Sequence, residues 1–308
     1  MKLLLTAVLS LLIMGAIFSR IDLREFQSYL SHLHVGIFVI ALFFFIPQIA
    51  LSAYRWQVMV RKRVRLDFWP SAKLILAANA LNILLPSRVG DLSKAYFAGR
   101  ETSLDFKRGM NVVLFEKYLD LVALGVVILT GVFAGREWDR LSLVGLLFST
   151  AMIGLFPVLC FINLAKSTEF QIFQSHALLK KLRNLLLDAQ VYLNEIKEKP
   201  QELVFLVGLS ILLWFVHLLQ FFLIFQAFHS QIPLFQVFRL VPLAILVGLI
   251  PVTLAGVGTR DSAMIYAFAP YESPALIAGV GLFASLRYFI PGILGLPFLN
   301  QYILKTGR

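Results

Sequence analysis

The sequence has few cysteines and few charged residues, and it lacks the common motifs for binding metal ions or ATP. Cys160 is its one cysteine, so an intramolecular disulfide is excluded. Only 15% of the 308 residues are charged, against about 25% in soluble domains. The five histidines are scattered without metal-ligand spacing, and no P-loop motif is present to bind ATP. We therefore expect no metal, no cofactor and no catalytic constellation.

Apolar residues are in excess, at 59% of the chain with a mean hydropathy of +0.82. A helix of about 20 apolar residues crosses a bilayer, and several runs approach that length. We expect a single all-α polytopic membrane domain over residues 1–308, beginning with an uncleaved helix because no cleavage site follows it. The expected spanning helices number about six, at residues 3–19, 35–54, 112–134, 142–165, 203–228 and 275–300.

Two shorter apolar segments, 72–86 and 236–251, end in similar turns. The first is followed by proline, glycine and charges between Asn82 and Lys94, and the second by the same residue types between Ile250 and Asp261. Each segment is too short to cross a bilayer comfortably. Interrupted segments at matching places in two halves indicate a transporter site. We therefore expect two re-entrant helical hairpins.

Lysine and arginine set the orientation of membrane helices. The densest basic cluster, Arg55 to Arg65, follows segment 35–54, and basic residues also follow segment 72–86 and fill the loop 166–202. Placing these on the cytoplasmic side of a plasma (inner) membrane puts both termini in the cytoplasm. The halves 35–134 and 203–300 then run in opposite directions. We expect an inverted repeat whose hairpin tips meet near the midplane.

The formal net charge of +11 would suggest nucleic acid in a soluble protein. Here the charge lies in loops, where it attracts anionic lipid, so no nucleic-acid partner is expected. In residues 176–199 the apolar positions repeat at spacings of three and four. This pattern predicts a cytoplasmic amphipathic helix that covers the bundle or binds a partner. Homo-oligomerisation stays open.

Segment 112–134 carries Glu116, Lys117 and Asp120, and segment 275–300 carries Arg287. Glu116 and Asp120 are four residues apart and share a helix face. A charge at the centre of a spanning helix costs about 2.5–3.5 kcal/mol, so these groups should be paired or hydrated. We expect Arg287 to pair with Glu116 or Asp120, as a structural ion pair or as part of a polar pathway. His217 is expected to pack between helices.

Each hairpin turn carries an arginine and an aspartate, Arg88 with Asp91 and Arg260 with Asp261. Helix N-termini that begin after such turns suit phosphate, and arginine binds phosphate oxygens two at a time. We therefore expect both arginines to act on cargo. The alternative is that each pair only caps and anchors its helix.

Three motifs of the sequence together resemble the flippase-like membrane domain of lysylphosphatidylglycerol synthases. The first runs from Asn82 through Pro86, Ser87, Arg88, Gly90 and Asp91 to Lys94, the second is Glu116 with Asp120, and the third runs from Gly256 to Asp261. The resemblance covers about residues 35–300 and implies a lipid-translocating domain with re-entrant helices. Asp261 stands where the family more often has glutamate, and Thr253-Leu-Ala replaces a glycine-rich approach. No transferase domain follows, so lysyl-lipid synthesis is not expected.

The function we expect is that of a lipid translocase, not an enzyme, which moves a phosphate-bearing or anionic membrane lipid between leaflets. The alternatives are a membrane-embedded transferase acting on a polyprenyl-phosphate or phospholipid, a small-solute or ion transporter, and a non-transporting assembly partner. The residues expected to bind or translocate the lipid are Asn82, Ser87, Arg88, Asp91, Glu116, Asp120, Arg260, Asp261 and Arg287.

Overall fold

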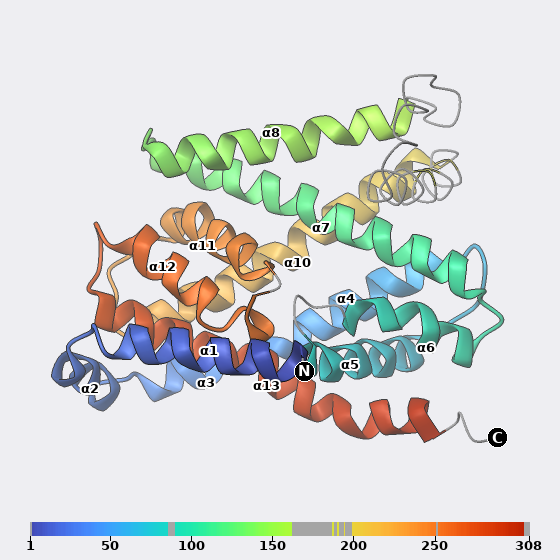
Figure 1. Cartoon of the computed structure of the whole chain (residues 1–308). Helices are drawn as coiled ribbons and strands as arrows, with labels where there is room; N and C mark the ends of the chain where they lie inside the picture. Colours follow the sequence, from blue (N-terminus) through green and yellow to red (C-terminus); the bar gives the residue numbers. More distant parts are fainter. Residues whose placement is uncertain are drawn as a thin grey trace.

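The computed structural model describes residues 2–85, 90–161, 187, 190, 194, 199–250 and 252–304, and this part of the chain is helical without a strand (Figure 1). The expected all-helical class is confirmed. The helices are α1 (Lys2–Phe18), α2 (Leu23–Ser31), α3 (Val35–Phe43), α4 (Phe45–Val60), α5 (Phe68–Leu84), α6 (Ser93–Glu101), α7 (Phe106–Gly135), α8 (Arg140–Phe161), α10 (Pro200–Ala227), α11 (Leu234–Gly248), the 3₁₀ turn η3 (Leu254–Gly256), α12 (Thr259–Phe268) and α13 (Pro274–Leu304).

The same order of long and short helices occurs twice. The continuous apolar stretch of α3 and α4 is 26 residues long and corresponds to α10, which has 28. The short helices α5 and α6, of 17 and 9 residues, correspond to α11 and α12, of 15 and 10. Each series ends in a long helix, α7 with 30 residues and α13 with 31. In Figure 1 the pair α11 and α12 lies to the left and the pair α5 and α6 to the right.

Three helical stretches in the described residues are long and apolar enough to cross a membrane, namely Val35–Val60, α10 and α13. A fourth is possible if the apolar part of α1 and α2, which meet at a bend of 95°, form one broken span. The expected six spans are therefore not all confirmed. The predicted segment 35–54 also ends too early, because helix continues to Val60 and places Arg55 inside the span.

Local sequence explains several helix ends. The Asp105 carboxylate accepts hydrogen bonds from the backbone N–H groups of Lys107 and Arg108, which caps the start of α7. Arg136 ends the same helix in a left-handed conformation, with φ at 52°. Pro200 begins α10 at a position where the missing N–H has no intrahelical partner to lose.

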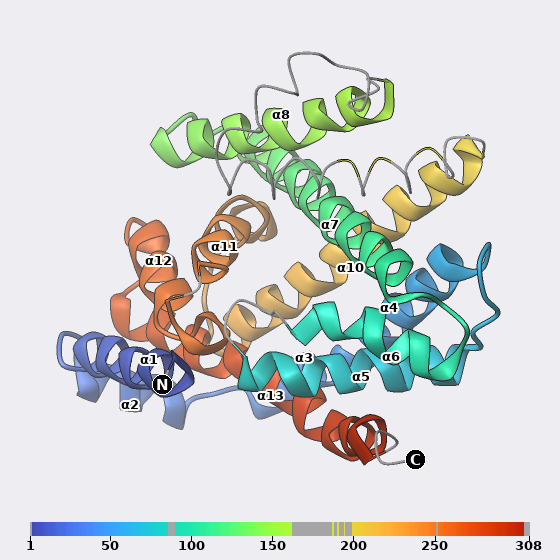
Figure 2. The same ribbon diagram turned by 45° about the vertical axis from the view of Figure 1, so that its right-hand side comes forward.

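The buried apolar side chains form two separate cores. The first joins α4, α5 and α6 to the N-terminal half of α7 and the C-terminal end of α13. The second joins α11 and α12 to the other halves of α7 and α13, with much of α10. The long helix α7 passes from one core to the other between Leu119 and Ala123. Figure 2 shows α7 crossing α10, and the two helices are in contact.

Each long helix packs closely against a short helix of the other series. A Cβ atom on Gly295 of α13 would lie 1.9 Å from the carbonyl oxygen of Leu76 in α5. A Cβ atom on Gly131 of α7 would lie 2.5 Å from the backbone nitrogen of Arg239 in α11. Small residues let membrane helices approach at backbone distance. These two contacts bind the halves of the chain together.

The backbone of the second hairpin turn adopts positive φ angles, which glycine adopts without steric cost. Ala255, Gly256 and Gly258 all have positive φ, at 50°, 75° and 96°, and α12 begins directly after them. The corresponding first turn includes residues 86–89, which lie outside the described part of the chain. Most of the predicted amphipathic helix at 176–199 lies outside it as well.

Candidate functional site: a charged cavity between two cores

A cavity of about 100 Å³ lies where the two apolar cores meet. Helices α4, α5, α7, α10 and α13 all line it, and so does Ala255 from the second hairpin turn. At about 30 Å³ for each water, it can hold roughly three waters. Its charged lining residues are Arg55, Asp91, Lys94, Glu116, Lys117, Asp120 and Arg287.

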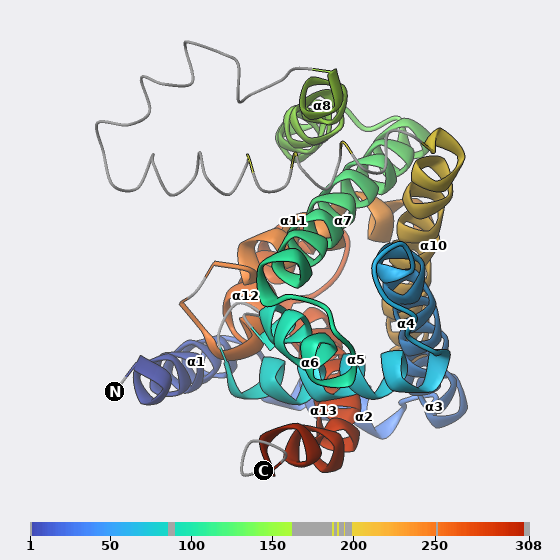
Figure 3. The same ribbon diagram turned by 90° about the vertical axis from the view of Figure 1, so that its right-hand side faces the viewer.

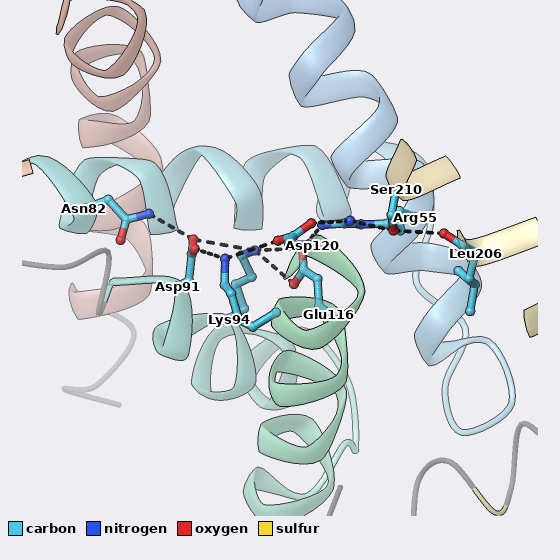
Figure 4. Close-up of polar contacts among 9 residues, drawn as sticks. Arg55, Asn82, Asp91, Lys94, Glu116, Asp120, Leu206 and Ser210 are labelled. Carbon is cyan, nitrogen blue, oxygen red and sulfur yellow. Dashed lines mark hydrogen bonds and ion pairs between the residues drawn. The ribbon is translucent and has the colours of Figure 1, made fainter. Parts of the chain in front are cut away.

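Arg55 of α4 is the centre of the ionic network (Figure 4). Its guanidinium donates to Glu116 at 2.8 Å, to Asp120 at 2.6 Å and to the hydroxyl of Ser210 at 2.9 Å. Ser210 in turn donates to the carbonyl of Leu206, one turn earlier in α10. The planar fork of arginine suits such multiple bonds, so one side chain joins α4, α7 and α10.

The first short-helix pair joins the network through α6. The ammonium of Lys94 donates to both oxygens of Glu116, at 3.0 and 3.1 Å, and lies 3.6 Å from Asp91. Asp91 also accepts from the Asn82 amide at 2.9 Å and from Lys117. Figure 4 shows Asn82, Asp91 and Lys94 on the side of Glu116 opposite Arg55. The first hairpin is therefore tied to α7 by ion pairs.

Exposure within the network increases from Arg55 toward the cavity. The side chains of Glu116, Arg55 and Lys94 are only 1%, 2% and 5% exposed, whereas those of Asp120 and Lys117 are 18% and 36% exposed. Buried charges persist where each has an opposite partner. The inner members are therefore compensated where they lie, and Asp120 and Lys117 are the more exposed members of the network.

The predicted pairing of Arg287 with Glu116 or Asp120 is wrong. Arg55 binds both carboxylates, while Arg287 lies 2.8 Å from Nδ1 of His217 and over the rings of Phe221 and Tyr288. Its centroid distances to these rings are 4.6 and 4.8 Å, within cation–π range. His217 correspondingly lines the cavity, where it contacts Arg287 and does more than pack between helices.

Arg260 and Asp261 lie beside this cavity and hold the second turn. Arg260 is 2% exposed and donates to Asp261 at 2.5 and 2.9 Å, to the carbonyl of Gly281 at 2.7 Å and to Ser285 at 3.0 Å. Asp261 accepts from the backbone N–H of Gly258 at 2.9 Å. These are the contacts of a helix cap and anchor. A direct role of Arg260 on cargo stays a prediction.

The structure thus brings most of the sequence-predicted residues to one place. Asn82, Asp91, Glu116 and Asp120 share one network, and Arg287 lines the same cavity. Ser87 and Arg88 lie outside the described residues. Sequence analysis missed Arg55 and Lys94, which it counted as cytoplasmic loop charges. The signal for Arg55 was a polar stripe on α4, where Gln48, Ser52 and Arg55 are spaced by four and three.

A second polar cluster lies at the first half of α11. Arg239 of α11 is 1% exposed and pairs with Glu137 at 2.8 Å and Asp139 at 3.3 Å, both in the α7–α8 loop. Partial burial alone would raise the pKa of the Glu137 carboxyl. Hydrogen bonds from Tyr271 and Gln236, with the charge of Arg239, outweigh burial and hold that pKa below its ordinary value.

Comparison of the sequence with known proteins identifies the protein family to which it is similar. The family model described as "Lysylphosphatidylglycerol synthase TM region" matches residues 2–295. The chain is similar to a UPF0104 membrane protein of Methanothermobacter thermautotrophicus, 24% identical over 282 residues that cover 83% of each chain. It is similar to two UPF0104 membrane proteins of Methanocaldococcus jannaschii. One is 24% identical, over 97% of this chain and 94% of the relative, and the other is 25% identical, over 60% and 77%.

Proposed function

Since the chain belongs to the lysylphosphatidylglycerol synthase TM region family, we propose that this integral membrane protein translocates a phosphate-bearing lipid between leaflets. The headgroup passes through the charged cavity while the acyl or prenyl tails stay in the bilayer. Only the desolvation of the headgroup then needs help, because tails in lipid gain nothing from a protein environment.

One observation carries this proposal. The cavity is lined by four cationic side chains, those of Arg55, Lys94, Lys117 and Arg287, and by three carboxylates, which leaves one excess positive charge. An excess charge inside a membrane domain is expensive until an anion neutralises it. A phosphodiester headgroup carries one negative charge and matches this excess. Lys117, the most exposed cation in the ionic network, and Arg287 are its proposed ligands.

The arrangement of helices supports the same function. We propose that the two series of helices form an inverted repeat, with both termini in the cytoplasm and the plasma membrane as location. Short helices α5 and α11 are then re-entrant halves that enter from opposite faces, as in transporters built around broken helices. Rocking of one short-helix pair against the other core exposes the cavity to each leaflet in turn.

Vesicles containing the full chain and a fluorescent phosphatidylglycerol test the proposal. Membrane-impermeant reductant destroys the outer-leaflet dye only, so translocation appears as dye lost beyond that half. We expect loss well above protein-free vesicles, and a marked slowing with Arg287→Gln. The control is Arg61→Gln, because Arg61 is 56% exposed and pairs with Glu202 away from the cavity. Equal rates with and without protein would refute the function.

Cysteine labelling tests the inverted arrangement separately. Because Asp91 and Asp261 are themselves buried, the test uses their exposed neighbours: in a Cys160→Ala background, a cysteine at Leu92 should react only from the cytoplasm and one at Ser262 only from outside. Reaction of both from the same side would remove the inverted repeat and leave the translocase proposal to stand on vesicle transport.

A further inference from the structure

The span formed by α3 and α4 is interrupted near its middle. Helix α3 ends at Phe43 and α4 begins at Phe45, so Phe44 belongs to neither. The N–H of Phe44 donates to the carbonyl of Ala41 at 3.2 Å, three residues back instead of four. Pro47 accounts for the interruption, because proline has no N–H to give to the carbonyl of Phe43 four residues back. We call residues 44–47 the α3–α4 break.

One side chain of α10, which lies beside α4 (Figure 3), bridges the α3–α4 break. The amide nitrogen of Gln220 donates to the carbonyl of Ala41, on the α3 side, at 2.8 Å. Its amide oxygen accepts from the amide of Gln48, on the α4 side, at 2.9 Å. Both glutamines are buried, and a polar group at membrane depth is costly without a partner. Gln220 therefore holds α3 and α4 at one angle.

The α3–α4 break lies where the chain passes from one apolar core to the other. Ala41 belongs to the second core, and Ile49 packs against the first. Helix α13 makes the same passage, from Ala284 in the second core to Leu299 in the first, and carries Pro291 between them. Helices α7 and α10 also pass between the cores, but they are unbroken and have no proline in that stretch.

This arrangement permits one simple movement. The unbroken helices α7 and α10 cross and are in contact (Figure 2), so the cores can turn about this crossing if α3–α4 and α13 bend. A helix bends most readily where proline has removed a backbone hydrogen bond. Hinges between rigid bodies consist of a few residues at the ends of helices or in loops, which absorb the change in φ and ψ. The α3–α4 break has this position and this composition.

We propose that the α3–α4 break is a hinge between the two cores, and that Gln220 is the positioning residue that holds it at the angle of this structure. A movement that separates Gln220 from Ala41 or Gln48 frees the hinge, and the cores then turn about the crossing of α7 and α10. The proposal rests on the proposed function for the use of this movement, which exposes the cavity to each leaflet. The hinge itself is measured without any cargo.

Distances between two spin labels, measured by pulsed electron paramagnetic resonance on the full chain in lipid nanodiscs, test the hinge. The labels are attached to cysteines that replace Trp69 of α5 and Tyr266 of α12, which are 72% and 75% exposed and lie on helices of different cores. A Cys160→Ala background removes the native thiol. We expect one dominant distance in this parent.

Gln220→Met keeps the length of the side chain and removes both hydrogen bonds across the break. The population of a second distance should rise about tenfold over the parent, which is what two neutral hydrogen bonds supply. Adding Pro47→Ala should abolish this second distance, because alanine supplies the N–H that continues the helix through the break. Gln48→Met leaves the bond from Gln220 to Ala41 in place, so the rise should be only about threefold.

A matched control separates the hinge from a general loss of stability. Gln236→Met also removes a buried glutamine, whose partner at 2.6 Å is Glu137 of the α7–α8 loop and not a residue of the break. It should lower the melting temperature without adding a second distance. If Gln220→Met fails to fold, Gln48→Met with and without Pro47→Ala makes the same comparison.

An unchanged distance distribution in the glutamine variants, or a second distance that survives the addition of Pro47→Ala, would overturn the hinge and leave Gln220 as a structural residue. The dye-loss assay separates this outcome from failure of the proposed function. Lipid translocation by a parent whose glutamine variants show no second distance would refute the hinge alone. A second distance that Pro47→Ala suppresses, in a protein that moves no lipid, would support the hinge and refute the proposed function.

Discussion

Replacing Arg55 by methionine is the most direct test of the buried network. The change removes three charged hydrogen bonds at once, two to the carboxylates of Glu116 and Asp120 and one to Ser210. It leaves Glu116, which is 1% exposed, with Lys94 as its closest cation. We expect a large loss of unfolding free energy and a weaker link between α4 and α7, which Arg55 connects by its ion pairs.

The magnitude follows from what remains after the change. Removing one partner of a buried ion pair costs about 3–5 kcal/mol, because the other charge stays buried. Three charged hydrogen bonds taken singly would suggest more, at about 1.5–3 kcal/mol each. Lys94 at 3.0 Å and Lys117 at 3.7 Å still neutralise the two carboxylates. The expected loss is therefore about 3–5 kcal/mol.

Unfolding in mixed micelles, followed by circular dichroism, measures this loss. Arg61→Met is the matched control, because Arg61 follows the same helix but is 56% exposed, and exposed pairs contribute about 0–1 kcal/mol. Adding Asp120→Asn to Arg55→Met should cost less than the two single losses combined, with a coupling of about 1–3 kcal/mol. Equal losses for Arg55→Met and Arg61→Met, or strict additivity, would refute the reasoning.

Three further outcomes are expected. Gly295→Ala should lower the unfolding free energy by about 3 kcal/mol, because its Cβ would meet the α5 backbone at 1.9 Å. Gly208→Ala is the control and should be neutral or slightly stabilising, since a Cβ at Gly208 has nothing within 4 Å. Equal melting temperatures of the two variants would contradict the close contact. Folding lowers the pKa of the Glu137 carboxyl below its ordinary value of 4.5. The ion pair of Glu137 with Arg239 therefore stabilises the protein fully above pH 4.5, and this contribution is lost as the pH falls through the lowered pKa of the folded state. Unfolding measured from pH 6 to 3 should therefore show a shallower acid slope in Glu137→Gln, and an unchanged slope would count against the pair. Arg260→Gln should destabilise the protein in the same unfolding assay, since it removes four buried hydrogen bonds; parent-like stability would instead favour a role on cargo.

The helical elements were largely predictable from the sequence, because apolar runs and proline or glycine breaks are local signals. Predicted segments 72–86 and 236–251 correspond to α5 and α11, which end at Leu84 and Gly248. Glycine at the second turn also has the positive φ that its sequence suggested. The number of spans was less predictable, since a bend such as the one between α1 and α2 depends on packing.

The partners of the buried charges were harder to predict. Arg55, Lys94 and Arg239 look like loop charges when counted by position, yet each is at most 4% exposed in the structure. Counting basic residues measures local density and carries no information on which helix face meets which neighbour. Only the tertiary arrangement, which brings Arg55 of α4 to Glu116 and Asp120 of α7, selects Arg55 over Arg287 as their partner.

The location of the network has a mechanical consequence. The apolar cores are separate, and α7 leaves one and enters the other at Asp120. The ion pairs of the network join α4, α6 and α7 on the side of the first core, and the pairs that Lys117 makes with Asp91 and Asp120 are the most exposed among them. Under the proposed function, an anionic headgroup that binds Lys117 competes with Asp91 and so weakens the tie between the first hairpin and α7. Under the proposed function, cargo binding and release of the first hairpin are then coupled.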